Sequence, residues 1–322
     1  MSGDSRYSRQ ELFPGLGAAG QAALRRAGVC VVGCGALGAA QADLLVRAGV
    51  GRMRIVDRDL VELSNLQRQV LFTEADAAAS LPKAVAAAER LRCVNGEVCI
   101  EPRVVDLRPG NAETLLEGLD LILDGTDNFE TRYVINDVAV KSGRPWIYGA
   151  CVGAYGVLMV IRPGITACLR CLMDRPPAPG TTPTCDTAGV IGPIVTAVAA
   201  CQAAEALKLL SGRPDEIRRD LLALDLWRGS QQSIEVPRNP SCAACGEGRY
   251  EHLEGRHAPG LTSLCGRDAV QISPPGPAAA IDLAALARRM EGAGEVTVNP
   301  YFVRLRVGEI QLTVFGDGRG IV

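Results

Sequence analysis

The sequence lacks several features that would point to particular classes of protein. Its 322 residues carry a formal net charge of −2 and no long basic run, which argues against nucleic acid as the main partner. The first residues, MSGDSRYSRQEL, contain no apolar stretch of the signal-peptide kind. Only two histidines occur, His252 and His257, and both lie outside every motif, so we predict no histidine-based triad. Nor does any internal repeat occur. These gaps favour a soluble, cytoplasmic protein with no nucleic acid or membrane partner.

Apolar residues and cysteines, by contrast, are plentiful. Hydrophobic residues make up 48% of the chain, enough for a sizeable core. The most apolar segment, residues 190–210, carries Gln202, Glu205 and Lys208, so we interpret it as a buried helix and not as a membrane span. Twelve cysteines in a cytoplasmic protein indicate free thiols or metal ligands more than disulfides.

Strand and helix patterns alternate between residues 28 and 150. This alternation predicts βαβ units and a doubly wound, mainly parallel, Rossmann-like α/β sheet. The expected strands are 29–32, 53–57, 119–126 and 145–150, and the expected helices are 82–93 and 128–143. Segments 153–164 and 221–236 alternate as antiparallel strands do, on either side of a helix at 193–210. We therefore expect one domain over residues 1–250, with an antiparallel extension. Residues 251–322 would form a small α+β appendage, with a helix at 281–290 and a hairpin at 301–315.

A glycine-rich turn follows the first expected strand. Gly33, Gly35 and Gly38 form G-x-G-x-x-G before a helix, and Asp57 ends the second strand. The glycines allow a tight turn whose helix start faces phosphate, and the carboxylate suits ribose hydroxyls. This pattern predicts a nucleotide site, and a nicotinamide-dependent oxidoreductase is its first interpretation.

Further charged and polar residues favour a triphosphate over a dinucleotide. Asp59, Asn65 and Arg68 follow the second strand within DRDLVELSNLQRQ, Lys83 opens a helix, and Asp127 follows the fourth strand. Cations at this edge neutralise phosphate oxygens, and a carboxylate holds Mg²⁺. Singly, each could instead be a solvated helix start or a helix cap; their combination favours ATP with magnesium.

Four cysteines form two C-x-x-C pairs. Cys168 and Cys171 make CLRC, and Cys242 and Cys245 make CAAC. Such pairs suit a tetrahedral zinc site, although buried free thiols and a redox pair remain alternatives because the two halves are far apart in sequence.

A fifth cysteine, Cys185, stands alone in TTPTCDTAGVIGP. A thiol just ahead of a helix can have a lowered pKa and act as a nucleophile; the alternative is a small residue in a flexible loop. We interpret the other seven cysteines as residues that pack in the protein interior: Cys30, Cys34, Cys93, Cys99, Cys151, Cys201 and Cys265.

The ordered set of these motifs, with RYSRQ at residues 6–10 and DGTDN at 124–128, resembles the ThiF/MoeB/HesA adenylyltransferases, bacterial relatives of ubiquitin-activating enzymes. The resemblance covers residues 5–248. It implies ATP-dependent adenylylation of the C-terminal glycine of a small ubiquitin-like sulfur carrier of the ThiS or MoaD type, ending in Gly-Gly. The products would be an acyl-adenylate and pyrophosphate, and the pathway thiamine thiazole or molybdopterin synthesis.

The resemblance also implies a role for each motif residue. Asp57 would bind the ribose, and Gly35 would lie against the nucleotide. Asn65, Arg68 and Lys83 would contact the phosphates, and Asp127 would hold Mg²⁺. Arg9 would reach the triphosphate of the neighbouring subunit in a homodimer. The four paired cysteines would hold a structural zinc ion. Cys185 would form a covalent link with the carrier during sulfur transfer, a role that adenylation does not need.

Two positions depart from the family pattern. Ala36 replaces a glycine in the phosphate loop, and Ser80 replaces the glycine three residues before the lysine. Neither change removes a charged group. The tail from 251 has no rhodanese-like loop, so we expect a separate sulfur donor, a cysteine desulfurase or a rhodanese. A non-catalytic scaffold that binds the carrier is a third hypothesis, which the presence of Lys83 and Asp127 disfavours.

Overall fold

The computed structural model describes residues 6–178, 181, 183–256, 261–264, 269–272 and 281–322. The chain forms two compact units, Met1–Glu254 and Gly255–Val322. This division falls a few residues beyond the boundary expected at 250. His257 and Cys265 lie outside the described residues.

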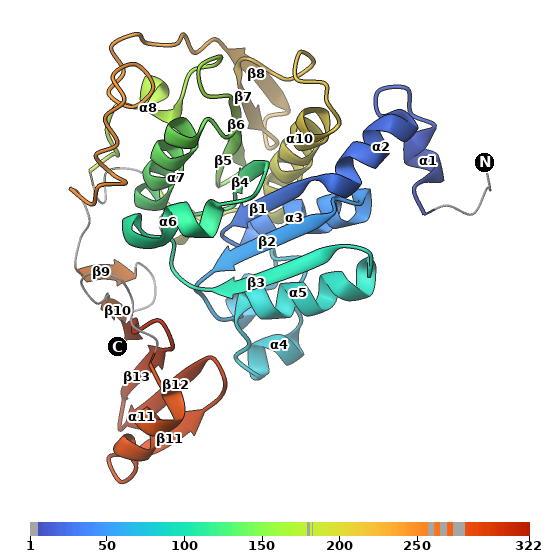
Figure 1. Ribbon diagram of the computed structural model, residues 1–322. Helices are drawn as coiled ribbons and strands as arrows, with labels where there is room; N and C mark the ends of the chain where they lie inside the picture. Colours follow the sequence, from blue (N-terminus) through green and yellow to red (C-terminus); the bar gives the residue numbers. More distant parts are fainter. Residues whose placement is uncertain (1–5, 179–180, 182, 257–260, 265–268, 273–280) are drawn as a thin grey trace. The chain divides into compact units, whose positions relative to one another are not determined.

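An eight-stranded sheet forms the centre of the first unit, in the order β3-β2-β1-β4-β5-β6-β7-β8 (Figure 1). Neighbours from β3 to β5 pair in parallel, and β6, β7 and β8 extend the sheet antiparallel. The strands are β1 (Gly28–Val32), β2 (Arg52–Asp57), β3 (Cys99–Val104), β4 (Leu121–Asp124), β5 (Trp146–Val152), β6 (Tyr155–Ile161), β7 (Leu221–Asp225) and β8 (Ser230–Ile234). The predicted Rossmann-like sheet with an antiparallel extension is thereby confirmed.

Helices cover both faces of the parallel part of this sheet (Figure 1). On β1, Val29 and Val31 face the apolar cluster of α3, α5 and α10, while Cys30 and Val32 face the cluster of α6 and α7. Burial on both faces explains why β1 is apolar without alternation. The helices of this unit are α1 (Ser8–Glu11), α2 (Gly17–Arg26), α3 (Ala36–Ala48), the 3₁₀ turn η1 (Leu63–Asn65), α4 (Glu74–Ala78), α5 (Lys83–Val94), α6 (Pro109–Leu116), α7 (Phe129–Ser142), α8 (Leu169–Leu172), α9 (Cys185–Ala188) and α10 (Gly192–Leu210).

Local sequence signals set the ends of the helices that position the site. At the start of α7, Asn128 accepts a hydrogen bond from the Thr131 N–H at 2.9 Å, and Gly143 ends the helix with φ +70°. Pro82 directly precedes α5, where the missing N–H of a proline costs no helical hydrogen bond. Asn128 and Pro82 therefore mark helices that begin at the carboxyl ends of the strands, and Gly143 ends a helix at the opposite side of the sheet.

Helix α10 is long and apolar enough to cross a membrane by length and composition. It packs instead against α3 and against β5 and β6. Gln202 and Glu205 are buried on its inner face, and the Gln202 amide hydrogen-bonds the carbonyls of Asp124 and Ile147, each at 3.2 Å. These contacts are those of a core helix, as the sequence predicted.

The second unit contains a six-stranded sheet in the order β11-β12-β13-β14-β10-β9 and one described helix that packs on it, α11 (Leu283–Met290). The predicted hairpin pairs Phe302 with Phe315, whose rings lie 6.1 Å apart at its buried end. Its strands are β9 (Leu261–Leu264), β10 (Ala269–Ile272), β11 (Glu295–Val298), β12 (Phe302–Val307), β13 (Ile310–Phe315) and β14 (Gly320–Ile321).

Candidate active site

The predicted glycines form a turn between β1 and α3 that leaves no room for a side chain at Gly33 or Gly38. Gly33 has φ +82°, and a β-carbon there would lie 2.7 Å from the backbone of Gly125. A β-carbon on Gly38 would collide with the carbonyl of Gly33. Gly35 is the N-cap of α3, so the first N–H groups of this helix are presented without a covering side chain. Such a turn can receive a phosphate group. Ala36 already belongs to α3 and packs against an apolar cluster, so its methyl group is accommodated.

Asp57, at the end of β2, holds this turn to the second strand. Its Oδ2 accepts the Cys34 N–H at 2.6 Å, and its Oδ1 accepts the Asp59 N–H at 2.7 Å. Burial raises the pKa of Asp57 above its ordinary value; the nearby Lys83 and the two N–H donors oppose that rise, and Asp59 adds to it. A carboxylate oxygen can accept more than one hydrogen bond, so Asp57 retains acceptor capacity for ribose hydroxyls.

Lys83 is buried beside Asp59. Its Nζ lies 3.2 Å from Asp59 Oδ2, and its backbone N–H donates to the Asp59 carbonyl at 2.9 Å. The Lys83 side chain is 6% exposed, an unusual position for an amine outside a functional site. Close by, Ser80 has φ +48°, the one positive φ of a non-glycine residue in the described chain. The left-handed backbone explains why the resembling family has glycine here, and Ser80 adopts it at some cost in strain.

The segment after β2 folds over the phosphate loop. The Gln69 amide nitrogen lies 3.7 Å from where a β-carbon of Gly35 would stand. Gln69 and Asn65 are 4% and 5% exposed, yet within the described chain neither Gln69 Oε1 nor Asn65 Oδ1 has a hydrogen-bond partner. Buried acceptors of this kind suit hydrogen-bond donors of a ligand. Arg68, between them in sequence, is partly exposed and donates to the Ser64 carbonyl at 3.0 Å.

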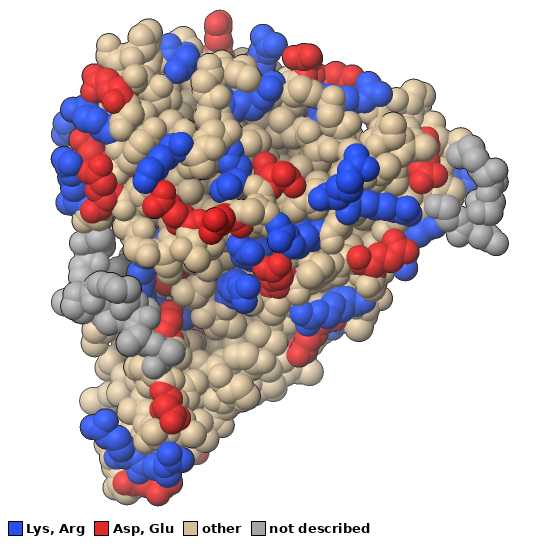
Figure 2. Space-filling model, in the orientation of Figure 1, with Lys and Arg blue, Asp and Glu red and all other residues tan. Residues whose placement is uncertain are grey.

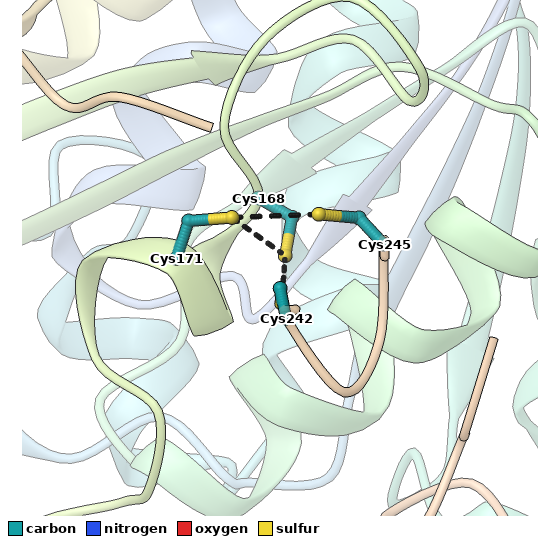
Figure 3. Close-up of side chains that lie close together, drawn as sticks. All are labelled: Cys168, Cys171, Cys242 and Cys245. Atoms are coloured by element: carbon teal, nitrogen blue, oxygen red, sulfur yellow. Dashed lines mark hydrogen bonds between the residues drawn. The ribbon is translucent and has the colours of Figure 1, made fainter. Parts of the chain in front are cut away.

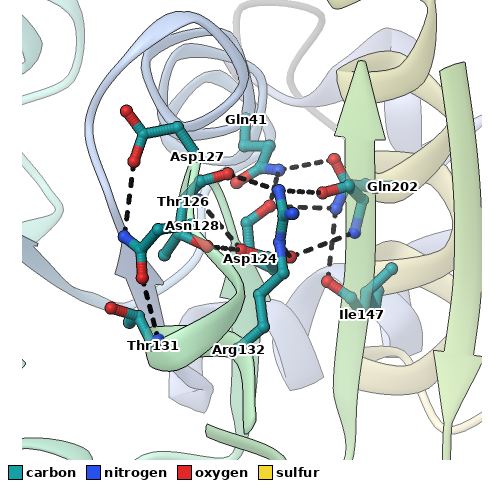
Figure 4. A network of polar contacts seen from close by, with 10 residues as sticks. Gln41, Asp124, Thr126, Asp127, Asn128, Thr131, Arg132, Ile147 and Gln202 are labelled. Carbon is teal, nitrogen blue, oxygen red and sulfur yellow. Dashed lines mark hydrogen bonds and ion pairs between the residues drawn. The ribbon is translucent and has the colours of Figure 1, made fainter. Parts of the chain in front are cut away.

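Asp127 is exposed just beyond β4. Figure 4 shows its carboxylate beside Asn128, whose Nδ2 lies 3.4 Å from Asp127 Oδ1. Arg58, which the sequence argument passed over, donates to both oxygens of Asp106 at 3.1 and 3.2 Å. Burial lowers the pKa of Arg58, but Asp106, Asp59 and Asp127 together raise it above its ordinary value. Arg58 is thus a second cation, after Lys83, near the predicted carboxylates Asp59 and Asp127. Its position directly after Asp57 in the sequence could have indicated this role.

A buried ion pair that sequence reasoning also missed supports the end of β4 (Figure 4). Arg132 Nε donates to Asp124 Oδ2 at 3.0 Å, and its Nη2 donates to the Thr126 carbonyl at 2.6 Å. Asp124 Oδ1 also accepts the Thr126 N–H and hydroxyl at 2.9 and 2.7 Å. Because both charges are buried and hydrogen-bonded, this pair fixes the turn that leads to Asp127.

Among the residues predicted to contact ATP, Arg9 is the one that lies far from the phosphate loop. Its neighbour Gln10 donates to the carbonyl of Ala48, the last residue of α3, at 2.9 Å. The phosphate loop is at the other end of this 13-residue helix, roughly 20 Å away. Arg9 is exposed in α1. On the face drawn in Figure 2, basic and acidic side chains are interspersed.

The four paired cysteines converge (Figure 3). Their sulfur atoms all lie within 4.8 Å of one another, with Cys168 3.6 Å from Cys242 and Cys171 3.4 Å from Cys245. Tetrahedral zinc with sulfur at about 2.3 Å requires sulfur atoms roughly 3.8 Å apart. Hydrogen bonds from the Cys168 thiol and from the Asn239 N–H (3.4 Å) outweigh burial and lower the pKa of Cys171 to about 4. The donor set and its spacing fit zinc.

Cys185 is the first residue of α9, a four-residue helix separate from α10. It therefore does not stand directly ahead of the long apolar helix, and the expected effect of that helix on its thiol does not apply. Among the other cysteines, Cys93 and Cys99 are exposed, so the packing interpretation is wrong for those two. Cys34, inside the phosphate loop, is fully buried, and burial raises its pKa.

The glycine turn follows β1 and lies where the strand order reverses, between β1 and β4. Together with a buried lysine beside an aspartate, it defines a nucleotide-binding α/β protein. Its site lies at the carboxyl edge of the parallel strands. The chain belongs to the ThiF family, whose model matches residues 7–244.

Individual relatives agree with this assignment. The chain is 44% identical over 320 residues to the sulfur carrier protein ThiS adenylyltransferase of Bacillus subtilis, covering 98% of this chain and 94% of that protein. It is 42% identical over 247 residues to the sulfur carrier protein adenylyltransferase of Thermus thermophilus, covering 75% and 90%. The crystal structure of E. coli MccB with MccA-N7isoASN shares the fold, with a TM-score of 0.68 at 23% identity over 76% of this chain and 75% of that one.

Proposed function

We propose that this protein uses ATP to adenylylate the C-terminal glycine of a small sulfur-carrier protein of the ThiS or MoaD type. The observation that carries the proposal is the buried Lys83 amine, 3.2 Å from Asp59 and close to Asp57 at the phosphate loop. It occurs in a chain 44% identical to a ThiS adenylyltransferase over almost its whole length. Hydride transfer itself does not require this cation, whereas chemistry on a triphosphate does.

In the reaction, a carboxylate oxygen of the carrier bonds to the α-phosphorus of ATP, and the bond from that phosphorus to the bridging oxygen of pyrophosphate breaks. Both reactants are anions, so the barrier is largely electrostatic, and placed cations and N–H groups lower it. The N–H groups at the start of α3 and Gly35 lie against the nucleotide, and Asp57 accepts the ribose hydroxyls. Lys83, Arg68 and Asn65 contact the phosphates. Asp59 orients the Lys83 amine.

Magnesium and zinc have separate places in this proposal. Asp127 would hold a magnesium ion together with ATP, and that ion would neutralise charge on the leaving phosphates. The exposed position of Asp127, with an oxygen beside the Asn128 amide, fits a ligand that enters with its nucleotide. Cys168, Cys171, Cys242 and Cys245 would hold zinc in a structural role, because four thiolates would leave no coordination position for a substrate.

Arg9 acts in a homodimer, where it reaches the triphosphate in the partner subunit. Its distance from the phosphate loop of its own chain supports this arrangement. Cys185 serves the later sulfur step, forming a covalent link with the carrier after adenylation. A cysteine desulfurase or a rhodanese supplies the sulfur, for thiamine or molybdopterin synthesis in the cytoplasm. Residues 251–322 form an extension that influences docking of the carrier or the donor.

The test is exchange of labelled pyrophosphate into ATP in the presence of candidate carriers ending in Gly-Gly. We expect exchange with at least one carrier, and none with the same carrier lacking its last glycine. Absence of exchange with every ThiS- and MoaD-like candidate contradicts the proposal. Carrier binding without exchange would support a scaffold, and tight binding of NAD(H) would support an oxidoreductase.

A further inference from the structure

Two cysteines outside the four-cysteine cluster meet at the end of β5. Cys151 is the last but one residue of that strand, and Cys185 begins α9. The Cys185 thiol donates a hydrogen bond to the Cys151 carbonyl at 3.4 Å. Both residues are partly buried. They are 34 residues apart in sequence, so only the fold brings them together.

The backbone holds both segments in place. Gly153 donates to the Gly189 carbonyl at 2.8 Å and accepts from the Ile191 N–H at 3.0 Å, which joins the chain after α9 to the end of β5. At the other end of α9, Thr184 and Thr187 cap the helix reciprocally: the Thr184 N–H donates to Thr187 Oγ1 at 2.9 Å. These contacts hold the Cys185 thiol against the Cys151 carbonyl, while the Cys151 thiol itself donates to the Ile194 carbonyl at 3.9 Å.

The Cys151 thiol is held in its protonated form. Burial, and after it the neighbouring Cys185 sulfur, raises the pKa of Cys151 to about 12, so Cys151 is a protonated thiol at neutral pH. When Cys185 enters a disulfide, its sulfur can no longer carry charge, and one of the two main causes of that rise disappears. Thr184, next to Cys185, is exposed, so an outside partner reaches Cys185 first, and Cys151 reacts second.

We propose that Cys151 is the resolving thiol of Cys185. When Cys185 carries another group in a disulfide, the Cys151 sulfur attacks Cys185 Sγ and forms the Cys151–Cys185 bond. The bond from Cys185 to the other sulfur breaks, and the expelled thiolate accepts the proton lost by Cys151. An external dithiol then reduces the Cys151–Cys185 disulfide and restores both thiols. Electrons balance in each exchange, since one disulfide replaces another.

In sulfur transfer, this step releases the product. If Cys185 holds the carrier as an acyl disulfide, the group that Cys151 expels is the carrier thiocarboxylate. This part rests on the proposed function; the thiol exchange itself needs neither ATP nor carrier. Failure of the exchange test therefore leaves adenylation untouched, and failure of pyrophosphate exchange leaves the thiol pair untouched.

The experiment treats the reduced full-length protein with glutathione disulfide and follows each cysteine by peptide mass spectrometry over time. In the wild type we expect a transient glutathione adduct on Cys185 that converts to a Cys151–Cys185 disulfide. In Cys151→Ser the adduct should persist about 10²-fold longer, because an intramolecular thiol reacts at a high effective concentration. Cys201→Ser is the matched control, a partly buried thiol on α10, and should behave as the wild type does.

The wild type alone can decide the question, so a folding defect in Cys151→Ser does not obscure it. A stable glutathione adduct on wild-type Cys185, with no bond to Cys151, overturns the proposal. So does a bond from Cys185 to any other cysteine. Cys151→Ala, with its thermal unfolding measured beside Cys151→Ser, separates loss of the thiol from loss of packing.

Discussion

The amine of Lys83 lies 3.2 Å from the Asp59 carboxylate, and the backbone N–H of the same lysine donates to the carbonyl of the same aspartate. This double contact ties the start of α5 to the segment that follows β2. It therefore couples the position of the cation to the end of the strand that carries Asp57.

Replacement of Lys83 should remove a placed charge without unfolding the protein. We expect Lys83→Ala to lower carrier-dependent pyrophosphate exchange by about 10²–10³-fold, the usual effect of losing one group that stabilises developing charge. Lys141→Ala is the control, because Lys141 forms an exposed ion pair with Glu113; its exchange rate should stay within about twofold of the wild type. Equal losses in both variants would refute the assignment.

The position of Arg9 leads to a complementation prediction. Arg9→Ala and Lys83→Ala should each be nearly inactive, whereas the two chains coexpressed should regain about a quarter of wild-type exchange. Half of the dimers are then mixed, and each mixed dimer holds one intact site if Arg9 acts across the dimer. No recovery in dimers shown to be mixed would mean that Arg9 acts within its own chain or not at all.

Cys185 separates two steps of the proposed reaction. We expect Cys185→Ser to retain pyrophosphate exchange within about threefold of the wild type, because adenylation needs placed charge and no thiol. Formation of carrier thiocarboxylate, followed by mass spectrometry with a sulfur donor present, should fall below detection. Loss of exchange in this variant would show that the proposed separation of steps is wrong.

The four-thiolate cluster predicts a metal-dependent stability. Elemental analysis should find about one zinc per chain, and Cys242→Ser should lose it. With a loss of about 4 kcal/mol, and roughly 2–4 °C per kcal/mol for a domain of this size, Tm should fall by about 10 °C. Cys201→Ser should keep both its zinc and its Tm. Wild-type stability in Cys242→Ser would argue against a structural metal.

The raised pKa of Cys151 predicts how its exchange depends on pH. The groups that act on this thiol are Cys185, Arg132 on α7, and Asp124 and Tyr148 on β4 and β5. Only the thiolate attacks, and its fraction grows as pH rises toward a pKa that burial, the largest cause, keeps raised in the adduct. The wild-type glutathione adduct should therefore resolve about tenfold faster per unit between roughly pH 6 and 8. A rate that is flat with pH would show that another step limits it.

The sequence predicted those parts of the fold that have strong local signals. Strands buried on both faces are apolar throughout, and helices such as α7 begin and end at Asn128 and Gly143. Strand β3 escaped notice because it lies at the sheet edge, contains Pro102 and leaves Cys99 exposed. Helices α2 and α6 were missed as well.

In the candidate site, too, the residues with local sequence signals were predicted and the contacts between separate elements were not. The glycine turn and the residues after β2 lie in contiguous motifs, so sequence spacing located them. The contacts of Asp124 with Arg132 and of Gln41 with Gln202 (2.5 Å) depend on packing between separate elements, which no local pattern reports. The sequence pattern also could not predict that Arg9 and Asp57 lie near opposite ends of α3, because their separation depends on the folded chain.

The contact between the backbones of Gly33, Gly38 and Gly125 has a consequence for the evolution of this protein. Any heritable change that adds a side chain at one of these positions must move two strands at once, so the loop is closed to gradual variation. Divergence toward other nucleotides or acceptors is left to the exposed positions of the neighbouring segment at residues 58–69, such as Leu63, Ser64 and Gln67, whose side chains can change without displacing the sheet. New specificities in such chains should therefore arise beside the loop while its own shape is inherited unchanged.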